Sequence, residues 1–407
     1  MNYSETIAYL DILSEARMSF GLQATKDILK AIGHPDQELF SVLVGGTNGK
    51  GSTCAFIHSI LMESSQRVGL FTSPHLETPR ERIRVDHDLI SEVAFARIAS
   101  IIRSAAEAEN LSLTYFEFMT ALAAQYFYEQ TCAVCIFEVG LGGRLDSTNA
   151  LTRVASVLTR VDLDHTHILG DTKEKIALEK LPIFEGTALQ VVAPQDEMII
   201  PTIQAYAREH SLSPIFVTSD DLPSQVELGL RGTYQRQNAA SAVALVRALD
   251  LDRSWDISED AILSGLRNTR LDGRLEHWHK GGHSDVWVDI GHNPNAVVQL
   301  VQYFQQRAPQ ERYTVVIGML KDKDWRSVIK LLEPWTSEFI FTLPRSERAW
   351  DLEEVSAATA HPHRMLPNLE NSLALALQKR ETVLCLGSFY LAGDIRRELT
   401  RLAFVRR

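Results

Sequence analysis

A glycine-rich segment at residues 45–53, GGTNGKGST, brings together the residue types that bind a nucleotide phosphate. Glycines allow backbone N–H groups to approach phosphate closely, Lys50 supplies a positive charge, and the hydroxyl of Ser52 or Thr53 can hold Mg²⁺. The usual phosphate loop reads G-x-x-x-x-G-K-[ST], whereas here the first glycine comes later and Gly51 follows the lysine. Because the order of glycine, lysine and hydroxyl is kept, the segment predicts a site for ATP or GTP, with Ser52 favoured as the metal-binding hydroxyl.

Two further polar residues follow apolar runs that have the pattern of buried strands. Glu138 comes after the run at 133–137, and His165 lies just past the run at 154–161. Open α/β sheets place ligands at the carboxyl ends of their strands, and a carboxylate there suits Mg²⁺. We therefore interpret Glu138 as a candidate metal ligand. On the pattern alone, His165 is no more than an ordinary surface histidine.

The elements that must position these residues are apolar, β-branched runs that alternate with helical patterns. The runs that predict strands are at 41–46, 68–73, 133–140, 154–161 and 189–194, and later at 284–291, 313–320, 338–344 and 382–388; clear helical patterns cover 93–109 and 117–130. This alternation predicts an α/β fold with mostly parallel sheets and helices on both faces. An Asp-Gly turn signal at 272–273 separates the two sets, so we place the domains at 1–270 and 271–407.

Composition restricts the class of protein. The 407-residue chain has a formal net charge of -11, so it lacks the basic excess of a general nucleic-acid binder. It contains no run of about 18 apolar residues that would predict a membrane span, and its first residues do not resemble a secretory signal. We therefore expect a cytoplasmic protein with neither nucleic-acid nor membrane partners. Cys132 and Cys135 form a C-x-x-C pair that no second pair or nearby histidine completes, which favours packing over metal binding.

Six further segments accompany the glycine-rich loop in a fixed order. They are TSPHL from Thr72, FEVGLGGRLDSTN from Phe137, DLDHTHILGDTKEKIALEK from Asp162, DIGHNPNA from Asp289, GMLKDKD from Gly318 and GSFYLAG from Gly387. Together with GGTNGKGST they resemble the Mur ligase superfamily, and within it the folylpolyglutamate synthase and dihydrofolate synthase family. The ordered set spans residues from about 40 to 394 and is far more specific than any one segment.

The resemblance implies a fold and an activity. The fold is a P-loop-type ATP-binding domain with a pterin site over residues 1–270, followed by a smaller Rossmann-like glutamate-ligase domain over residues 271–407. The activity is an ATP-dependent ligation of L-glutamate to dihydropteroate and to reduced folates through an acyl phosphate. ATP and two Mg²⁺ ions are implied as cofactors, and we expect the enzyme to be a monomer.

The resemblance also implies roles for individual residues. The implied catalytic residues are Lys50, His165 and Lys180, and the implied ligands of the two Mg²⁺ ions are Ser52, Ser73, Glu138, His165 and Lys180, the last as a carbamate. The residues implied to bind ATP are Gly46, Thr47, Asn48, Gly49, Lys50, Gly51, Ser52, Thr53, Asn238, Arg274 and Asp289. The pterin or folate is implied to contact Phe116, Arg144, Asp146 and Ser147, and glutamate is implied to contact His292 and Ser388.

Two positions depart from the family pattern. Lys180 is followed by Leu-Pro-Ile where the family has Ala-Gly-Ile, and Asp272 stands where the family has a proline before the Gly-Arg pair. Three alternative functions account for part of the sequence. A monofunctional folylpolyglutamate synthase stays open, whereas a cell-wall Mur ligase needs a further domain where only about 44 residues precede the loop. A nucleotide-dependent switch would not account for the segments at 289–296 and 387–393.

Overall fold

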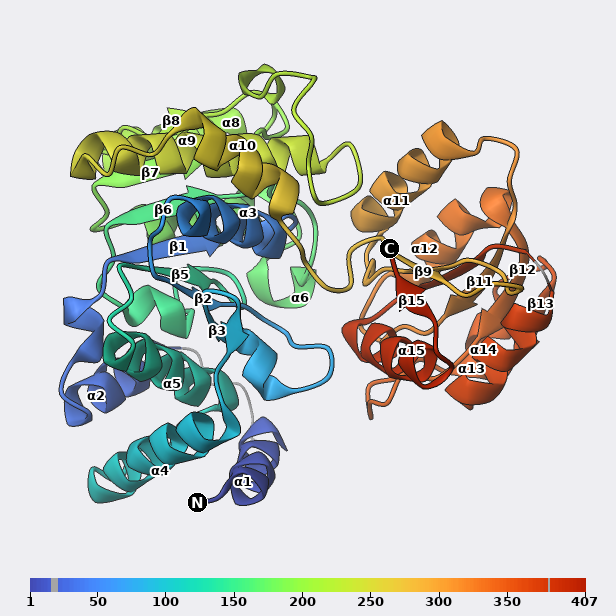
Figure 1. The fold of residues 1–407 in the computed structure, drawn as a ribbon, viewed down its shortest axis with the longest axis horizontal. Helices are drawn as coiled ribbons and strands as arrows, with labels where there is room; N and C mark the ends of the chain where they lie inside the picture. The colour runs from blue at the N-terminus through green and yellow to red at the C-terminus, as the bar shows by residue number, and fades with distance from the viewer. Residues whose placement is uncertain (16–20, 380) are drawn as a thin grey trace. The chain divides into compact units, whose positions relative to one another are not determined.

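The computed structural model describes residues 1–15, 21–379 and 381–407. These residues form two compact units (Figure 1). The first unit consists of Met1–Gly229 and Gln235–Arg270, and the second of Leu230–Tyr234 and Leu271–Arg407. The chain therefore passes from one unit to the other after residues 229, 234 and 270.

The first unit is built on a sheet whose eight strands, within the described residues, run in the order β4-β3-β2-β5-β1-β6-β7-β8. The strands from β2 to β8 in that order are parallel, and β3 and β4 extend one edge as antiparallel strands. Their bounds are β1 Ser41–Gly45, β2 Val68–Phe71, β3 Ile83–Val85, β4 Asp88–Leu89, β5 Val134–Glu138, β6 Ala155–Leu158, β7 Leu189–Val192 and β8 Ile215–Phe216.

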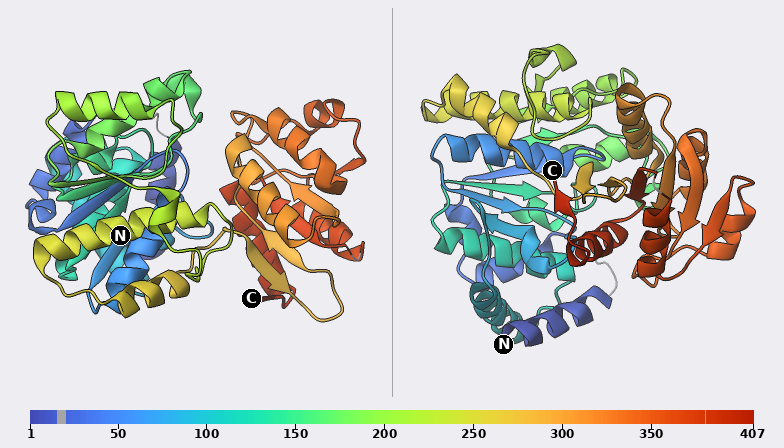
Figure 2. Two further views of the ribbon diagram at one scale, coloured as in Figure 1. Left: turned by 90° about the horizontal axis from the view of Figure 1, so that it is seen from above. Right: turned by 45° about the vertical axis from the view of Figure 1, so that its right-hand side comes forward.

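Helices cover both faces of this sheet, as two further views show (Figure 2). Helices α3, α9 and α10 pack together on one face, while α2, α4, α5, α7 and α8 contribute to a large hydrophobic core on the other. The bounds are α1 Tyr3–Glu15, α2 Gln23–Ala31, α3 Lys50–Glu63, α4 Glu92–Ala108, α5 Tyr115–Glu129, α6 Thr166–Leu169, α7 Lys173–Lys180, α8 Ile200–Glu209, α9 Gln235–Arg253 and α10 Glu259–Asn268. Short 3₁₀ turns lie at η1 Pro35–Glu38, η2 Pro79–Arg82, η3 Ser147–Ala150, η4 Leu181–Phe184 and η5 Ser219–Asp221.

The second unit repeats this architecture on a smaller scale. Its seven strands, within the described residues, run in the order β13-β12-β11-β14-β10-β9-β15; those from β13 to β10 are parallel, and β9 and β15 are antiparallel. The strands are β9 Glu276–His279, β10 Val286–Val288, β11 Tyr313–Ile317, β12 Thr336–Phe341, β13 His363–Met365, β14 Val383–Leu386 and β15 Val405–Arg406. The helices are α11 Pro294–Arg307, α12 Trp325–Leu332, α13 Leu352–Ala357, α14 Leu369–Gln378 and α15 Phe389–Arg401, with the 3₁₀ turn η6 Glu333–Trp335.

The predicted α/β fold with mostly parallel sheets is confirmed. The long apolar runs are β1, β2, β5, β6 and β7 in the first unit and β10, β11, β12 and β14 in the second. The strands that the patterns did not predict, β3, β4, β8, β9, β13 and β15, are only two to four residues long and lie at or near the sheet edges. Such strands depend on pairing with a neighbour more than on their own apolar pattern.

Two predictions from composition also have a structural counterpart. All four cysteines are buried and free, which for Cys132 and Cys135 agrees with their interpretation as packing residues. In the part of the chain that the structure describes, no helix is both long and apolar enough to cross a membrane.

Candidate active site

The glycine-rich loop connects β1 to α3 and is fixed by the segment that follows β6. The backbone N–H groups of Thr47 and Asn48 donate to the carbonyl oxygen of Arg160 at 2.9 and 3.1 Å. The Thr47 hydroxyl donates to the Asp162 carbonyl oxygen and accepts from the Asp162 N–H, both at 3.0 Å. Protein contacts alone therefore fix the conformation of the loop, which lowers the ordering cost of binding a ligand.

Helix α3 begins directly after the loop and lacks a side-chain cap. Gly49 occupies the N-cap position and offers no side chain that could accept from the first turn. The first N–H groups of a helix, here from Lys50 onwards, have no partner within the helix. These donors and the positive end of the helix dipole fit a phosphate group.

Two glycines of the loop could not be replaced without displacing a neighbour. Gly46 has φ +144°, and a Cβ atom there would lie 1.9 Å from the hydroxyl oxygen of Thr159. Gly49 has φ +92°, and its Cβ atom would lie 2.3 Å from the side-chain oxygen of Asn238. Asn238 is buried on α9, and its amide donates to the side-chain oxygen of Gln235 at 2.9 Å. The structure thus places Asn238 against the loop, within the first unit.

Two lysines converge on the end of β1. The ammonium group of Lys50 donates to the carbonyl oxygens of Gly46 and Thr47 at 3.2 and 3.3 Å. The ammonium group of Lys180 donates to the same carbonyl oxygen of Gly46 at 2.9 Å. Lys180 is only 3% exposed, which is rare for a lysine, and among the described residues no carboxylate forms a salt bridge with it.

This environment perturbs Lys180 strongly. Burial, together with the positive charge of Lys50, lowers the pKa of Lys180 to about 7, although Asp164 and Asp146 oppose the shift. Burial disfavours the charged form of an amine, and a nearby cation does the same. A substantial fraction of Lys180 is therefore uncharged near neutral pH, and such an amine is nucleophilic.

The Leu-Pro-Ile sequence after Lys180 is accommodated by a change of helix type. Helix α7 ends at Lys180, and η4 starts at once, with Pro182 in its first turn. A proline at that position loses no hydrogen bond, because the first N–H groups of a helical turn have no partner in it. Gly143 packs against the same point, since a Cβ atom there would lie 2.7 Å from the carbonyl oxygen of Lys180.

Two of the predicted metal ligands belong to β5 and to the segment after β6, and both of these strands are neighbours of β1. Glu138 is the last residue of β5 and is buried, and its carboxylate accepts from the backbone N–H of Ser73 at 3.0 Å. His165 precedes α6 with φ +50°, and its side chain is 36% exposed. Among the described residues, no three His, Cys, Asp or Glu side chains form a group that could hold a metal. A Mg²⁺ ion here would therefore draw on hydroxyl and phosphate oxygens, as this ion usually does.

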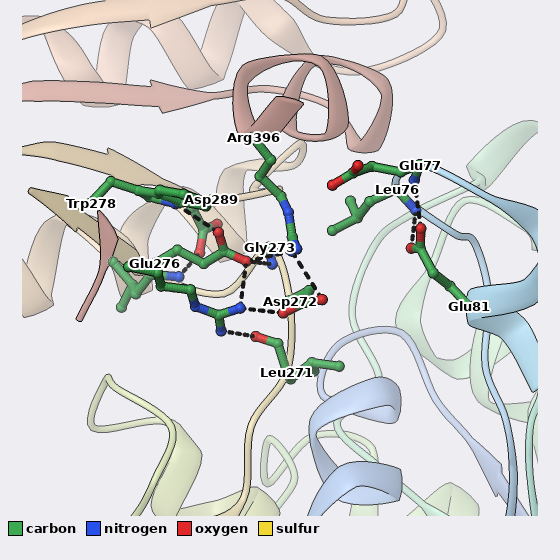
Figure 3. A network of polar contacts seen from close by, with 12 residues as sticks. Leu76, Glu77, Glu81, Leu271, Asp272, Gly273, Glu276, Trp278, Asp289 and Arg396 are labelled. Atoms are coloured by element: carbon green, nitrogen blue, oxygen red, sulfur yellow. Dashed lines mark hydrogen bonds and ion pairs between the residues drawn. The ribbon is translucent and has the colours of Figure 1, made fainter. Parts of the chain in front are cut away.

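The loop after Ser73 is shaped by one carboxylate. Glu81 accepts from the backbone N–H groups of Leu76, Glu77 and Thr78 at 2.8, 2.9 and 2.8 Å (Figure 3 draws the first two). Three donors on one carboxylate keep the loop compact beside the end of β2, where Ser73 lies.

Phe116 and Asp146, both predicted to contact the pterin, meet at Gly140. A Cβ atom on Gly140 would lie 2.7 Å from the Phe116 ring and 3.2 Å from a carboxylate oxygen of Asp146. The Asp146 carboxylate accepts from the N–H of Leu141 at 2.8 Å and from the hydroxyl of Thr148 at 2.6 Å. Burial raises the pKa of Asp146, and these hydrogen bonds counteract it in part. A flat apolar ring thus lies beside a buried acid.

The other two predicted pterin residues make different contacts. Ser147 is buried, and its hydroxyl lies 2.7 Å from the hydroxyl of Thr120 on α5. The guanidinium of Arg144 pairs with Glu179 at 2.9 Å, with half of the Arg144 side chain exposed. Ser147 therefore belongs to the wall between η3 and α5, whereas Arg144 lies at the surface of the loop.

In the second unit, the predicted residues gather where β10 and β14 end. Asp289 follows β10, and Ser388 follows β14 as the N-cap residue of α15. The guanidinium carbon of Arg274 lies 5.8 Å from the ring centre of Phe389. The ring of His292 also lies 5.8 Å from that of Phe389. Sequence reasoning did not single out Phe389, which links the two.

Asp289 is the buried acid of this group. Its carboxylate accepts from the backbone N–H groups of Leu275 at 2.9 Å and Gly291 at 2.7 Å. Burial raises the pKa of Asp289, and the positive charge of Arg274 is the strongest opposing influence. Asp289 therefore links the segment around Arg274 to the end of β10.

Sequence reasoning missed other residues of the first unit. Asp164 acts on the charge of Lys180, and Asp162 holds the glycine-rich loop. The sequence pattern that pointed to Glu138 also applies to these two residues, because both are acidic residues that come shortly after a buried strand, β6. Arg82, which donates to His75 at 2.9 Å and lies 5.0 Å from the Tyr115 ring, gave no comparable signal.

Comparisons with known proteins identify the family. The profile of the Mur ligase middle domain matches residues 44–222, and that of the Mur ligase glutamate ligase domain matches residues 273–389. The dihydrofolate synthase/folylpolyglutamate synthase of Bacillus subtilis (strain 168) is 35% identical, over 96% of this chain and 99% of its own length. The chain belongs to the folylpolyglutamate synthase/dihydrofolate synthase family.

Solved structures of this family match both units. E. coli FolC in complex with DHPP and ADP aligns with a TM-score of 0.87 at 29% identity, over 99% of this chain and 98% of that chain. A bifunctional folylpolyglutamate synthase/dihydrofolate synthase with Mn, AMPPNP and L-glutamate bound aligns with a TM-score of 0.88 at 28% identity, over 98% and 99%. As a family member, the chain is an ATP-dependent ligase that uses a divalent metal ion.

A glycine substitution tests the loop. Gly49→Ala should weaken ATP binding at least about 10-fold, which corresponds to about 1.4 kcal/mol, because the new methyl group collides with Asn238. The matched control is Gly33→Ala, since Gly33 has nearly the same φ, +93°, but nothing within 4 Å of its Cβ position. Calorimetric titration with ATP should show the loss in the first variant only. Equal ATP affinity in the two variants would contradict the inference that the loop requires a glycine at position 49.

The low pKa of Lys180 has a consequence for stability. Between a folded pKa of about 7 and an unfolded pKa of about 10.4, the unfolded state binds the proton more strongly, so wild-type stability rises with pH. From pH 7 to 9, the free energy of unfolding of the wild type should rise relative to that of Lys180→Met by at most about 1.4 kcal/mol per pH unit. Denaturant unfolding in CO₂-free buffer measures this gain. Lys175→Met is the control on the same helix, since the Lys175 side chain is 62% exposed; an equal slope for both variants would refute the assignment.

Proposed function

We propose that this enzyme joins L-glutamate to dihydropteroate and extends reduced folates with further glutamate. The observation that carries the substrate assignment is the meeting of the Phe116 ring and the Asp146 carboxylate at Gly140. An aromatic ring offers a stacking surface to a flat heterocycle, and a buried acid can hydrogen-bond its ring nitrogens. The name of the Bacillus subtilis relative and the DHPP in the E. coli complex support the same substrate class.

The first unit would bind the triphosphate and the metal. The N–H groups at the start of α3 would hold phosphate oxygens, and Lys50 would turn from its own loop carbonyls toward the terminal phosphates. Ser52, Ser73 and Glu138 would hold one Mg²⁺ ion, and His165 and Lys180 a second. Bound Mg²⁺ would neutralise charge on the phosphates during transfer.

Carboxylates do not react with amines at neutral pH, so the pteroate or folate carboxylate must first be activated. Transfer of the γ-phosphoryl group of ATP to a carboxylate oxygen would form an acyl phosphate. The glutamate amine would then attack the acyl carbon, with phosphate as the leaving group and an amide as the product. We propose that Arg274 and Asp289 of the second unit contact ATP and that His292 and Ser388 contact glutamate.

We further propose that the enzyme carries out both reactions, as a monomer in the cytoplasm and without nucleic-acid or membrane partners. The bifunctional names among its relatives support the first part, and the net charge of -11 agrees with the absence of nucleic acid. A monofunctional folylpolyglutamate synthase is the alternative. Growth of a strain that lacks dihydrofolate synthase, when supplied with this gene, would distinguish the two.

A coupled assay tests the function. Purified enzyme should release phosphate from MgATP only when both dihydropteroate and L-glutamate are present, because the acyl phosphate forms on the first substrate and is consumed by the second. Mass spectrometry should detect the amide product in amounts equal to the phosphate released. Phosphate release that does not depend on a pteroate would refute the substrate assignment.

The Phe116→Ala variant tests the proposed pterin contact in the same assay. Loss of the stacking surface should raise the KM for dihydropteroate by about 10-fold or more, because base–aromatic stacking is worth about 1–3 kcal/mol. The KM for ATP should stay unchanged. A variant in which both constants rise together would argue against a pterin contact at Phe116.

Carbamylation of Lys180 is a separate part of the proposal. The uncharged amine would attack the carbon of CO₂, form an N–C bond and release one proton, leaving an anionic carbamate. That anion would replace a positive charge beside Lys50 with a negative one that can hold a metal. The burial of Lys180 and its proximity to Lys50 support this change.

Labelled bicarbonate tests the carbamate. Wild-type enzyme incubated with isotopically labelled bicarbonate should show a carbamate carbon signal by NMR that is missing in Lys180→Ala. Removal of CO₂ should lower the turnover of the wild type, and bicarbonate should restore it, because the carbamate would supply the anionic ligand of the second Mg²⁺ ion, beside the neutral His165. A wild type without the signal and indifferent to bicarbonate would exclude the modification.

A further inference from the structure

Arg274 lies in an unusual turn of the second unit. The residues on either side of it both have left-handed backbone conformations, with φ +73° at Gly273 and φ +43° at Leu275. Glycine adopts this conformation easily, but a leucine rarely does, and Leu275 is fully buried. Such strain persists only where surrounding contacts impose it, and it is concentrated at functional positions.

Backbone hydrogen bonds hold the turn on both sides of Arg274. The N–H of Gly273 donates to the Glu276 carboxylate at 2.7 Å, and the carbonyl oxygen of Gly273 accepts from the N–H of Ile290 at 3.0 Å. On the other side, the N–H of Leu275 donates to Asp289 at 2.9 Å. The carbonyl oxygen of Leu275 also accepts from a side chain, that of Arg231 in the Leu230–Tyr234 segment, at 3.1 Å.

Charged side chains brace the same turn, and Figure 3 labels Asp272, Glu276 and Arg396 among them. One guanidinium nitrogen of Arg396 on α15 lies 3.1 Å from Asp272 and 2.7 Å from Glu276. One guanidinium nitrogen of Arg406 on β15 bonds to Asp272 and lies 3.4 Å from Glu276. Each arginine thus bridges both carboxylates, and the carboxylates lie on either side of Arg274 in the sequence.

The charges in this group are balanced. The Glu276 side chain is fully buried and also accepts from the indole N–H of Trp278 at 2.9 Å. Burial would raise the pKa of Asp272, but the charges of Arg396 and Arg406 lower it below its ordinary value. Removing one arginine would leave the two carboxylates with a single guanidinium group, which is unfavourable for the fully buried Glu276.

We propose that Arg396 and Arg406, acting through Asp272 and Glu276, are positioning residues that fix the direction of the Arg274 guanidinium. This inference rests on the proposed contact of Arg274 with ATP. It explains why the network surrounds a strained turn: the charged side chains impose a backbone that holds Arg274 in one orientation beside Asp289 and Phe389.

Hydrogen exchange tests the first half of the inference without any need for activity. In Arg406→Ala, the amides of residues 273–276 should exchange at least about 10-fold faster than in the wild type, because the turn loses one of its braces. Arg326→Ala is the control, since Arg326 forms an exposed ion pair with Glu354 at 2.6 Å in the same unit. Unchanged exchange at 273–276 in Arg406→Ala would overturn the proposal.

A double-mutant cycle tests the second half. Arg274→Ala, Arg406→Ala and Asp272→Asn should each lower kcat by between about 10- and 100-fold with little change in the KM for dihydropteroate, because displacing a group by about 1 Å can have effects of this size. In the Arg274→Ala background, Arg406→Ala and Asp272→Asn should lower kcat no further. Arg406→Lys should recover part of the activity, since it keeps the charge but loses the planar donor fork.

The outcomes separate this inference from the proposed function. A wild type without pteroate-dependent turnover would refute the function, while hydrogen exchange would still decide whether the network braces the turn. Losses of kcat that add in the double variants would overturn the positioning role even with the function intact. Full activity of Arg274→Ala would overturn it as well, because no residue could then act through Arg274.

Discussion

The carbonyl oxygen of Gly46 accepts from two lysine ammonium groups, Lys50 at 3.2 Å and Lys180 at 2.9 Å, and much of the first unit is arranged around that point. Two like charges near each other in a buried place are unfavourable, and the folded protein relieves this partly through the lowered pKa of Lys180. Asp164 and Asp146 counteract part of the same repulsion. The charge of Lys180 therefore depends on groups from several segments that follow β5 and β6.

The parallel sheet is what allows so many groups to reach this point. Because β1 lies between β5 and β6, the loops that follow all three strands begin at the same edge. They contribute the glycine-rich loop, the segment from Glu138 to Asp146, and the segment from Thr159 to His165. The second unit uses the same principle on a smaller scale, since β10 and β14 are parallel neighbours that are followed by Asp289 and Ser388, respectively. In both units, backbone N–H groups donate to the buried acids Asp146 and Asp289. The lysines of the first unit, in contrast, donate to a backbone carbonyl oxygen.

How far the sequence predicts this arrangement depends on the range of the contact. Glu138 could be placed because a strand pattern and a polar residue at its end are neighbours in the sequence. Phe116 could not be distinguished from an ordinary core residue by periodicity, since its position beside Gly140 depends on how α5 packs against β5. The sequence also could not predict the partners of Asp272. Arg396 and Arg406 lie more than 120 residues away from it, and both stand among charged residues of the kind that usually face solvent. Family resemblance supplied roles in such cases, but not the contacts that hold the residues in place.

At both positions where the sequence departs from the family pattern, arginine side chains hold the local backbone. After Lys180, the carbonyl oxygens of Pro182, Ile183 and Glu185 accept from the guanidinium of Arg153, at 3.5, 3.3 and 2.7 Å. At the second position, the guanidinium groups of Arg396 and Arg406 form ion pairs with the Asp272 carboxylate. In each place a planar arginine from a distant part of the chain binds several acceptors of a short irregular segment at once. At Asp272, side-chain contacts from α15 and β15 thus replace the backbone restriction that a proline would supply locally. The segments beside Lys180 and Arg274 are held by contacts that no local motif encodes.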